Sequence, residues 1–336
     1  MSSQVSFSEN PEFNEYLDSD TNNLVRIAGI TFSSSDVLYR LDYDAYISAL
    51  NDYKEVRESE LKENIAYEYP TPIAYYFQQA EDGYDNNNHR LQLLRSTWEA
   101  IIFTLYAIVI GEVRSKSINL RSIGNSFSDY FSDRLGTKLL LIERILEYST
   151  SNGITLNSQQ IMSIDTIQKI RSLNQERNEF LHTAALSEDQ AAVRFTELMP
   201  DVLDVLQNLK ELEYVDIMRF TQTVNALNEL KCEVFNGHSM TRKYKTVTVD
   251  ITQLTTLSNE LNTASVIVSY NSQIYNVSPF LHYRFEANGN ATNLCYYKKE
   301  KPGSTYEFEV MSRAESFEIP RLNFDVRVNE LRGLTI

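Results

Sequence analysis

The feature that most constrains the fold of this chain is a change in the spacing of its apolar residues near Tyr214. Before this point they recur every three or four positions, most clearly in Leu94, Trp98, Ile101, Leu105 and Ile108. After it they alternate with polar residues, as in Tyr244–Ile251 and Thr305–Met311. The first spacing is typical of amphipathic helices and the second of half-buried strands. The sequence therefore predicts an α+β protein, with an all-helical bundle followed by an antiparallel β-rich domain.

The residues before the bundle predict a smaller segment. Met1–Asn23 is polar and acidic, and we expect it to be loose. Leu24–Phe32 and Val37–Tyr43 both alternate, and Ser33-Ser34-Ser35 between them is a turn signal, so a β-hairpin is predicted. A polar helix should follow over Asp44–Ala66.

These patterns predict three regions: an N-terminal segment (1–66), a helical domain (67–213) and a β-rich domain (214–336). The helices expected in the second region are Thr71–Glu81, His89–Ser115, a short helix within Asn119–Leu135, Thr137–Tyr148, Asn157–His182 and Ser187–Leu212. The strands expected in the third region are Val215–Val224, Lys231–Phe235, Tyr244–Ile251, Ser265–Tyr270, Gln273–Val277, Tyr283–Ala287, Asn293–Lys298 and Thr305–Met311. We expect the third region to fold independently, because the periodicity changes at its border.

A short motif near the middle of the chain indicates chemistry. Arg177, Asn178 and His182 lie at the end of a predicted helix, and Arg177 falls on the apolar stripe that contains Ile170 and Leu173. A charge at a position that loses water needs a partner or a ligand. Imidazole moves protons near neutral pH and guanidinium holds a phosphate as charge builds on it, so this set suits metal-independent cleavage of RNA.

Two further polar residues are candidates for supporting roles. Asn174 precedes Asn178 and His182 at four-residue intervals and extends a polar ridge beside the apolar stripe. Glu99 lies on the long helix next to Trp98, where a carboxylate either orients the arginine or faces solvent. A structural interpretation of the motif also stays open. In it the aliphatic part of Arg177 packs along a contact between helices and His182 lies exposed at a helix end.

The motif resembles the Arg-polar-x-x-x-His motif of the HEPN superfamily, whose members are small helical domains and in many cases metal-independent RNA endonucleases. The resemblance covers roughly Tyr67–Tyr214 and includes Tyr69-Pro70-Thr71-Pro72-Ile73-Ala74 before a helix. It implies a homodimer in which Arg177 and His182 of both protomers face one cleft. It also implies a toxin or antiviral effector that another protein, an antitoxin or a sensor, holds inactive.

Two features depart from that pattern. The residue two positions after His182 is Ala184, where members controlled by nucleotidyltransferase antitoxins carry a modified tyrosine. Five residues along a helix also correspond to about 140° of rotation, so Arg177 and His182 do not share one face. The second protomer would have to complete the cleft.

Composition limits the other possibilities. The 31 basic and 46 acidic residues give a net charge of −15, which argues against non-specific coating of nucleic acid. The two cysteines and four histidines show no metal-ligand or disulfide spacing, and no glycine-rich phosphate loop is present, so no metal or other cofactor is predicted. No signal peptide or membrane span is recognisable, and a reducing cytoplasm is the simplest location.

Two functions follow from these observations. The first is a metal-independent HEPN-type RNA endonuclease with a regulatory β-rich domain. The alternative is a non-catalytic HEPN-like module that dimerises or binds a nucleotide or a protein, which the acidic charge favours. Two basic clusters with neighbouring tyrosines, Arg242-Lys243-Lys245 and Lys298-Lys299-Lys301, either stack bases or are solvated strand edges.

Overall fold

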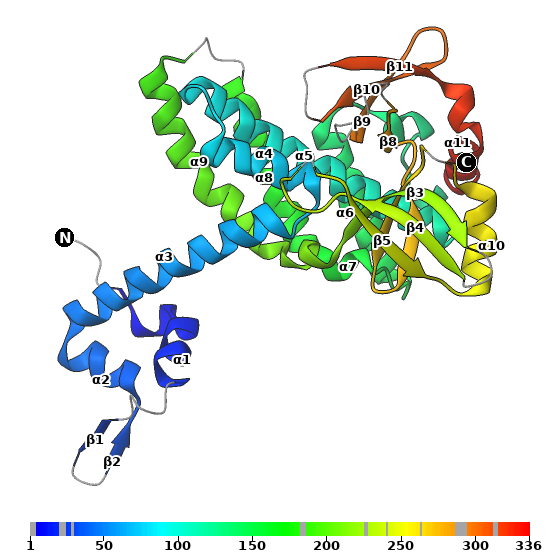
Figure 1. Ribbon diagram of the computed structural model, residues 1–336. Coiled ribbons are helices and arrows are strands. Elements are labelled where there is room, and N and C mark those ends of the chain that lie inside the picture. Colours follow the sequence, from blue (N-terminus) through cyan, green and yellow to red (C-terminus); the bar gives the residue numbers. More distant parts are fainter. Residues whose placement is uncertain are drawn as a thin grey trace. The chain divides into compact units, whose positions relative to one another are not determined.

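The structure is a computed structural model that describes residues 5–19, 25–27, 30–181, 186–224, 228–239, 241–262, 264–285, 294–311 and 315–336. It is a mixed α+β protein, as predicted (Figure 1). The chain divides into two compact units, Met1–Glu63 and Asn64–Ile336.

The first unit has a small aromatic core. Phe13, Tyr46 and Leu50 are almost completely buried in it, and the Tyr46 hydroxyl donates a 2.7 Å hydrogen bond to Asn14 Oδ1. Its elements are η1 (Phe7–Glu9), α1 (Pro11–Ser19), β1 (Val25–Ile27), β2 (Ile30–Phe32), α2 (Ser34–Leu41) and the first part of α3 (Tyr43–Tyr67). The predicted polar helix is thus confirmed as α3, but the N-terminal region expected to be loose contains η1 and α1.

The predicted second hairpin strand, Val37–Tyr43, is wrong. Residues from Ser34 to Leu41 form helix α2, and the hairpin is the shorter β1–β2 pair. Ser33 explains the difference, because its side chain accepts a hydrogen bond from the Asp36 amide and caps the helix. The serine run that indicated a turn is therefore a helix start.

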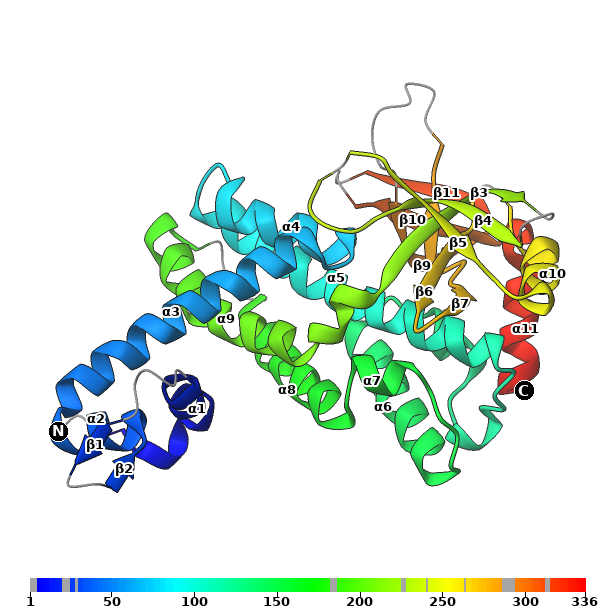
Figure 2. The same ribbon diagram turned by 60° about the horizontal axis from the view of Figure 1, so that its bottom comes forward.

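The second unit begins with a layer of helices around α5. Its helical elements are α4 (Thr71–Asp82), α5 (Asn87–Ser115), η3 (Arg121–Ile123), η4 (Phe127–Phe131), α6 (Leu135–Ser151), α7 (Ser158–Ile161), α8 (Ile164–Leu181), α9 (Glu188–Asn208) and η5 (Lys210–Tyr214). Helix α5 packs against α4, α6 and α9 and is the centre of this layer (Figure 2). Every residue of α5 from Ala100 to Val113 is buried, as expected for a helix that is apolar on all sides.

Helix α5 also meets the length and hydropathy of a membrane span. It is the one such helix among the described residues, but 83% of its most apolar window is buried inside the protein. It therefore has the surroundings of a core helix.

Two of the predicted helices are interrupted. The segment predicted as Asn157–His182 forms α7 and α8, because Met162 is extended and the Ser163 hydroxyl accepts a 3.0 Å hydrogen bond from the Thr166 amide, which starts a new helix. The segment predicted as Asn119–Leu135 forms two 3₁₀ turns, and Gly124 between them has a φ of +76°. Pro200 lies inside α9 without ending it.

Two antiparallel sheets follow the helices. The five-stranded sheet has the order β5-β4-β3-β6-β7 and the four-stranded sheet the order β11-β10-β9-β8. Their strands are β3 (Asp216–Val224), β4 (Glu229–Val234), β5 (Lys243–Thr248), β6 (Val266–Tyr270), β7 (Gln273–Asn276), β8 (Leu281–Tyr283), β9 (Leu294–Lys301), β10 (Thr305–Val310) and β11 (Ser316–Pro320). Seven of the eight predicted strands have a counterpart here, displaced by a few residues at most. The predicted strand Tyr283–Ala287 shares only Tyr283 with β8; Arg284 and Phe285 are not in a strand, and residues 286–287 lie outside the described residues.

Helices that the periodicity did not predict complete this half of the unit. They are α10 (Ile251–Glu260), η7 (Arg321–Phe324) and α11 (Asp325–Thr335). Helix α10 covers one face of the five-stranded sheet, where Leu254 and Leu257 join a core with Met218 and Cys232. Strand β11, also not predicted, pairs with β10 at the edge of the second sheet.

The helical and β-rich halves are joined by many polar contacts. Thr71 Oγ1 donates to the carbonyl of Gly237, the Tyr76 hydroxyl to that of Met311 and the Tyr297 hydroxyl to that of Phe131. Gly237 is required at this junction, because its φ is +77° and a Cβ would lie 2.7 Å from the carbonyl oxygen of Tyr67. Secondary structure does change where the domain border 213/214 was predicted, but residues 64–336 form one compact unit.

Candidate functional site

The motif that indicated RNA cleavage lies at the end of α8. Arg177 and Asn178 belong to the last turns of this helix. Their side chains, and His182 as a whole, lie outside the described residues. The relative placement of the guanidinium and the imidazole therefore stays a prediction. The surroundings of the motif are described below from the residues of α8 before it and of α9 after it.

The inward side of α8 contains an amide. Ile167 and Ile170 are completely buried and Asn174 is 2% exposed, at the spacing of a helix face that packs inward. Leu173, expected on this stripe, is only half-buried. The sequence placed Asn174 on a polar ridge beside the apolar stripe; in the structure the buried line of α8 passes through position 174 instead of 173.

Side-chain pairs fix α8 to both of its neighbours. On one side Arg171 forms an ion pair with Glu143 of α6, and Gln168 donates a 3.0 Å hydrogen bond to the same carboxylate. On the other side Lys169 forms an ion pair with Asp204 of α9. The helix that contains Arg177 and Asn178 is therefore held by polar contacts on two sides.

After the motif the described residues continue at 186, just before α9. The first turn of α9 is hydrogen-bonded to the first turn of α5. Ser187 caps α9 through the Gln190 amide. The Glu188 carboxylate accepts hydrogen bonds from Asn88 Nδ2 at 2.5 Å and from the Asn87 amide at 2.7 Å, and these bonds lower the pKa of Glu188. The N-termini of α5 and α9 are thus linked directly.

Glu99 is oriented toward the second sheet. Its carboxylate lies 2.9 Å from Arg95 Nε and 4.0 Å from Lys298 Nζ of β9. Lys298 in turn lies 2.7 Å from Glu309 of β10. The structure therefore assigns Glu99 to an ion-pair group between α5 and the second sheet, and a role in orienting Arg177 has no support from these contacts.

The basic clusters of the β-rich half are paired with acids. Lys299 and Lys301 both contact Glu307, and Lys301 also contacts Glu318. Lys245 forms an ion pair with Asp216 across the five-stranded sheet. These contacts favour the interpretation of the clusters as strand-edge ion pairs over base stacking.

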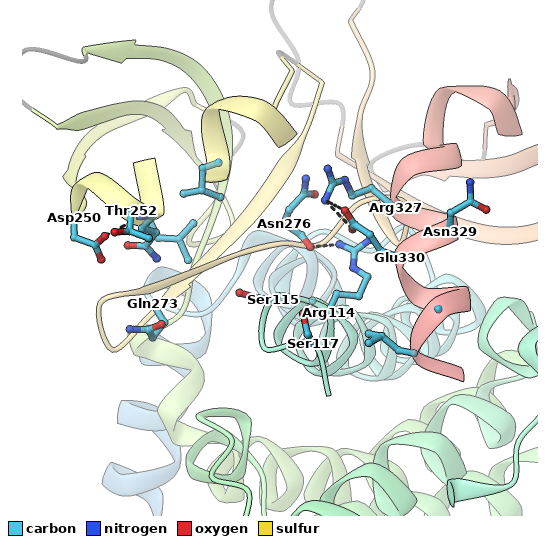
Figure 3. A pocket seen from close by; sticks show the side chains of 16 residues that line it. Arg114, Ser115, Ser117, Asp250, Thr252, Gln273, Asn276, Arg327, Asn329 and Glu330 are labelled. Atoms are coloured by element: carbon cyan, nitrogen blue, oxygen red, sulfur yellow. Dashed lines mark hydrogen bonds and ion pairs between the residues drawn. The ribbon is translucent and has the colours of Figure 1, made fainter. Parts of the chain in front are cut away.

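A cavity of about 600 Å³ lies at the other end of α5 (Figure 3). Its walls come from the C-terminal end of α5, the first turns of α10, strand β7 and helix α11. Both arginines of its lining make hydrogen bonds within the protein. Arg114 donates to the carbonyl oxygens of Ser278 (2.6 Å) and Asn276, and Arg327 donates to both carboxylate oxygens of Glu330. Sequence reasoning missed this cavity because its walls are far apart in the chain and no local motif marks them.

Metal-binding groups are dispersed. In the described part of the chain, no three His, Cys, Asp or Glu side chains lie close enough to hold a metal ion. His282 packs against Phe308 and Phe324, and burial lowers its pKa to about 4. Cys232 and Cys295 are buried free thiols.

Comparison with known proteins adds no relative to this description. No family model, curated protein or solved structure matches the chain.

Proposed function

We propose that this protein is a metal-independent RNA endonuclease of the HEPN type. The observation that carries the proposal is the Arg177-Asn178-x-x-x-His182 motif, whose first two residues lie in the last turns of a helix with the buried amide Asn174 on its inward side. A buried amide needs hydrogen-bonding partners, and a polar group one turn before the motif suits a site that binds a phosphodiester. The clamp of α8 between α6 and α9 supplies the rigid support that a catalytic constellation needs.

The reaction would proceed without a cofactor. His182 would accept the proton of a ribose 2′-hydroxyl, whose oxygen attacks the adjacent phosphorus. The 5′-oxygen would leave with a proton from His182 of the partner subunit, which gives a 2′,3′-cyclic phosphate and a 5′-hydroxyl end. Arg177 would stabilise the charge on the phosphate, and Asn178 would orient one of the two groups.

The remaining assignments belong to the same proposal. The chain would act as a homodimer in the cytoplasm, as a toxin or antiviral effector, and an antitoxin or sensor protein would control it through the β-rich half. The buried thiols Cys232 and Cys295 suit a reducing compartment.

Cleavage of labelled RNA in the presence of EDTA tests the chemistry. We expect the wild type to release fragments with a 2′,3′-cyclic phosphate, and His182→Ala and Arg177→Ala to lose at least about a hundredfold in rate. Arg121→Ala, which removes an exposed arginine in η3, is the matched control and should cleave like the wild type. Equal cleavage by all four proteins would contradict the proposal.

Thermal melting of Arg177→Ala separates catalysis from structure. A catalytic Arg177 should be replaceable with little change in melting temperature, whereas a structural ion-pair member would leave an unpaired carboxylate and lower it clearly. A destabilised variant that retains cleavage ends the catalytic assignment. A dimer that binds RNA or protein but never cleaves RNA would instead support the non-catalytic HEPN-like module.

A further inference from the structure

The cavity at the C-terminal end of α5 has the size and the walls of a small-molecule site. Its volume of about 600 Å³ lies within the usual range for such pockets. Figure 3 shows Asp250 and Thr252 on one wall and Asn276, Arg327 and Glu330 on the opposite wall. The space between these walls is therefore bordered by hydrogen-bonding groups on two sides.

The charges around the cavity cancel. The lining contains two arginines, Arg114 and Arg327, and two acids, Asp250 and Glu330. Arg114 is 8% exposed and donates its hydrogen bonds to main-chain carbonyls. Arg327 Nη1 lies 2.6 and 2.7 Å from the two carboxylate oxygens of Glu330. Because each guanidinium already faces an acceptor, the cavity offers little attraction to a phosphate or another anion.

The remaining walls are suited to a neutral ligand with both polar edges and an apolar face. Seven lining residues are uncharged and polar, and three are aliphatic. Amides such as Gln253 and Gln273 each present a donor and an acceptor side by side, which is the pattern that pairs with the edge of a nucleobase. The aliphatic side chains of Leu257 and Ile274 offer an apolar surface for the ring, and Ser115 and Asp250 offer partners for sugar hydroxyls.

We propose that this cavity binds an uncharged nucleoside. The base would lie against the aliphatic side chains with its edge toward the glutamine amides, and the ribose would face the hydroxyl and carboxylate groups. This assignment does not depend on RNA cleavage by the motif of α8, because binding is measured directly and on protein that need not be active.

A glycine in the wall allows the cavity to be filled without disturbing the core. Gly333 lines the cavity on α11, and a Cβ at this position would meet no other atom within 4 Å. Gly333→Leu should therefore fold normally, and leucine favours a helix over glycine. Gly136 on α6 is the matched control, since it is also helical with open space around its Cβ but does not line the cavity.

Calorimetry and thermal shift of the full chain with adenosine, guanosine, cytidine and uridine test the proposal. At least one nucleoside should bind the wild type and Gly136→Leu with equal affinity. The same nucleoside should bind Gly333→Leu at least tenfold more weakly. It should also bind more weakly to Gln273→Leu, which removes an exposed amide. The corresponding 5′-monophosphate should bind no more tightly than the nucleoside. The proposal of a nucleoside site is overturned if no nucleoside binds or if binding to Gly333→Leu is unchanged. It is also overturned if the monophosphate binds more tightly than the nucleoside, or if maltose binds and nucleosides do not.

Discussion

Glu112 and Lys138 in the helical half are both removed from solvent, and the protein accommodates them in opposite ways. Glu112 of α5 is 0% exposed and Lys138 of α6 is 1% exposed. The Glu112 carboxylate accepts hydrogen bonds from the amides of Asn157 (2.6 Å) and Ser158 (2.9 Å), and Lys116 Nζ lies 2.8 Å away. A buried charge with this many donors is compensated by fixed dipoles and a counter-ion.

Lys138 has a different environment. Its ammonium group donates to the carbonyl of Ser132 at 2.6 Å and lies over the rings of Phe103 and Tyr106, at 5.2 and 4.6 Å from their centroids. Within the described residues no carboxylate lies within ion-pair distance of it. Burial lowers the pKa of Lys138 from 10.5 to about 7, so the folded protein loses the proton of this lysine far more readily than the unfolded chain does.

The contrast shows what each buried group contributes. Glu112 connects α5 to the start of α7, and Tyr275 of β7 contacts the same network through Asn157 at 2.7 Å. The polar group therefore organises three elements. Lys138 mainly fills space between aromatic rings, so its charge is dispensable while its aliphatic stem is not.

Glu112→Ala should have the largest effect of the changes that follow from this comparison. It leaves the amides of Asn157 and Ser158 without their acceptor, while Lys116 keeps the carbonyl of Thr155, and we expect the free energy of unfolding to fall by about 2–5 kcal/mol. Urea denaturation followed by circular dichroism measures this. Glu99→Ala on the same helix, whose carboxylate is partly exposed, should cost about 1 kcal/mol or less. Similar losses for the two variants would mean that the Glu112 network is not the junction we describe.

Lys138 should give the protein a stability that rises with pH. The folded protein holds this lysine with a pKa of about 7 against an ordinary value of 10.5, so above pH 7 the unfolded chain binds more protons. Stability should increase by roughly 1–2 kcal/mol between pH 7 and 8.5. Lys138→Met keeps the apolar stem, so it should be at least as stable at pH 7 and should remove most of the increase. A wild-type slope that persists in Lys138→Met would show that another group titrates in this range.

His282 should give a smaller effect of the same kind on the acid side. Burial lowers its pKa from 6.5 to about 4, so between these values the unfolded chain binds a proton that the folded protein excludes. Stability should therefore fall by roughly 1 kcal/mol between pH 6.5 and 5. Because carboxylates titrate nearby, the informative quantity is the difference between the wild type and His282→Phe in chemical denaturation at several pH values. Parallel pH profiles for the two proteins would exclude this contribution.

Local pattern predicted much of the secondary structure. The helices around Trp98 and Leu139 and the strands after Tyr214 were found from periodicity, because side chains that face a core repeat with the pitch of their own element. The same reasoning failed at α2, where a serine cap decided in favour of a helix, and at α10 and α11, whose short apolar patterns are only interpretable beside the sheets they cover.

The sequence by itself determined the mixed α+β class, most of the helices before Tyr214 and strands after it, and the residues of a candidate catalytic motif. The tertiary structure decided which polar groups are buried and which elements come together to line the cavity at the end of α5. Glu112 finds its donors 45 and 46 residues later in the chain, and Arg114 finds its acceptors beyond residue 270. Such contacts depend on how separate elements pack, and periodicity describes only the face that an element turns toward its core. For this reason the motif of α8 could be recognised in the sequence, while the buried place of Asn174 and the cavity beside α11 could not.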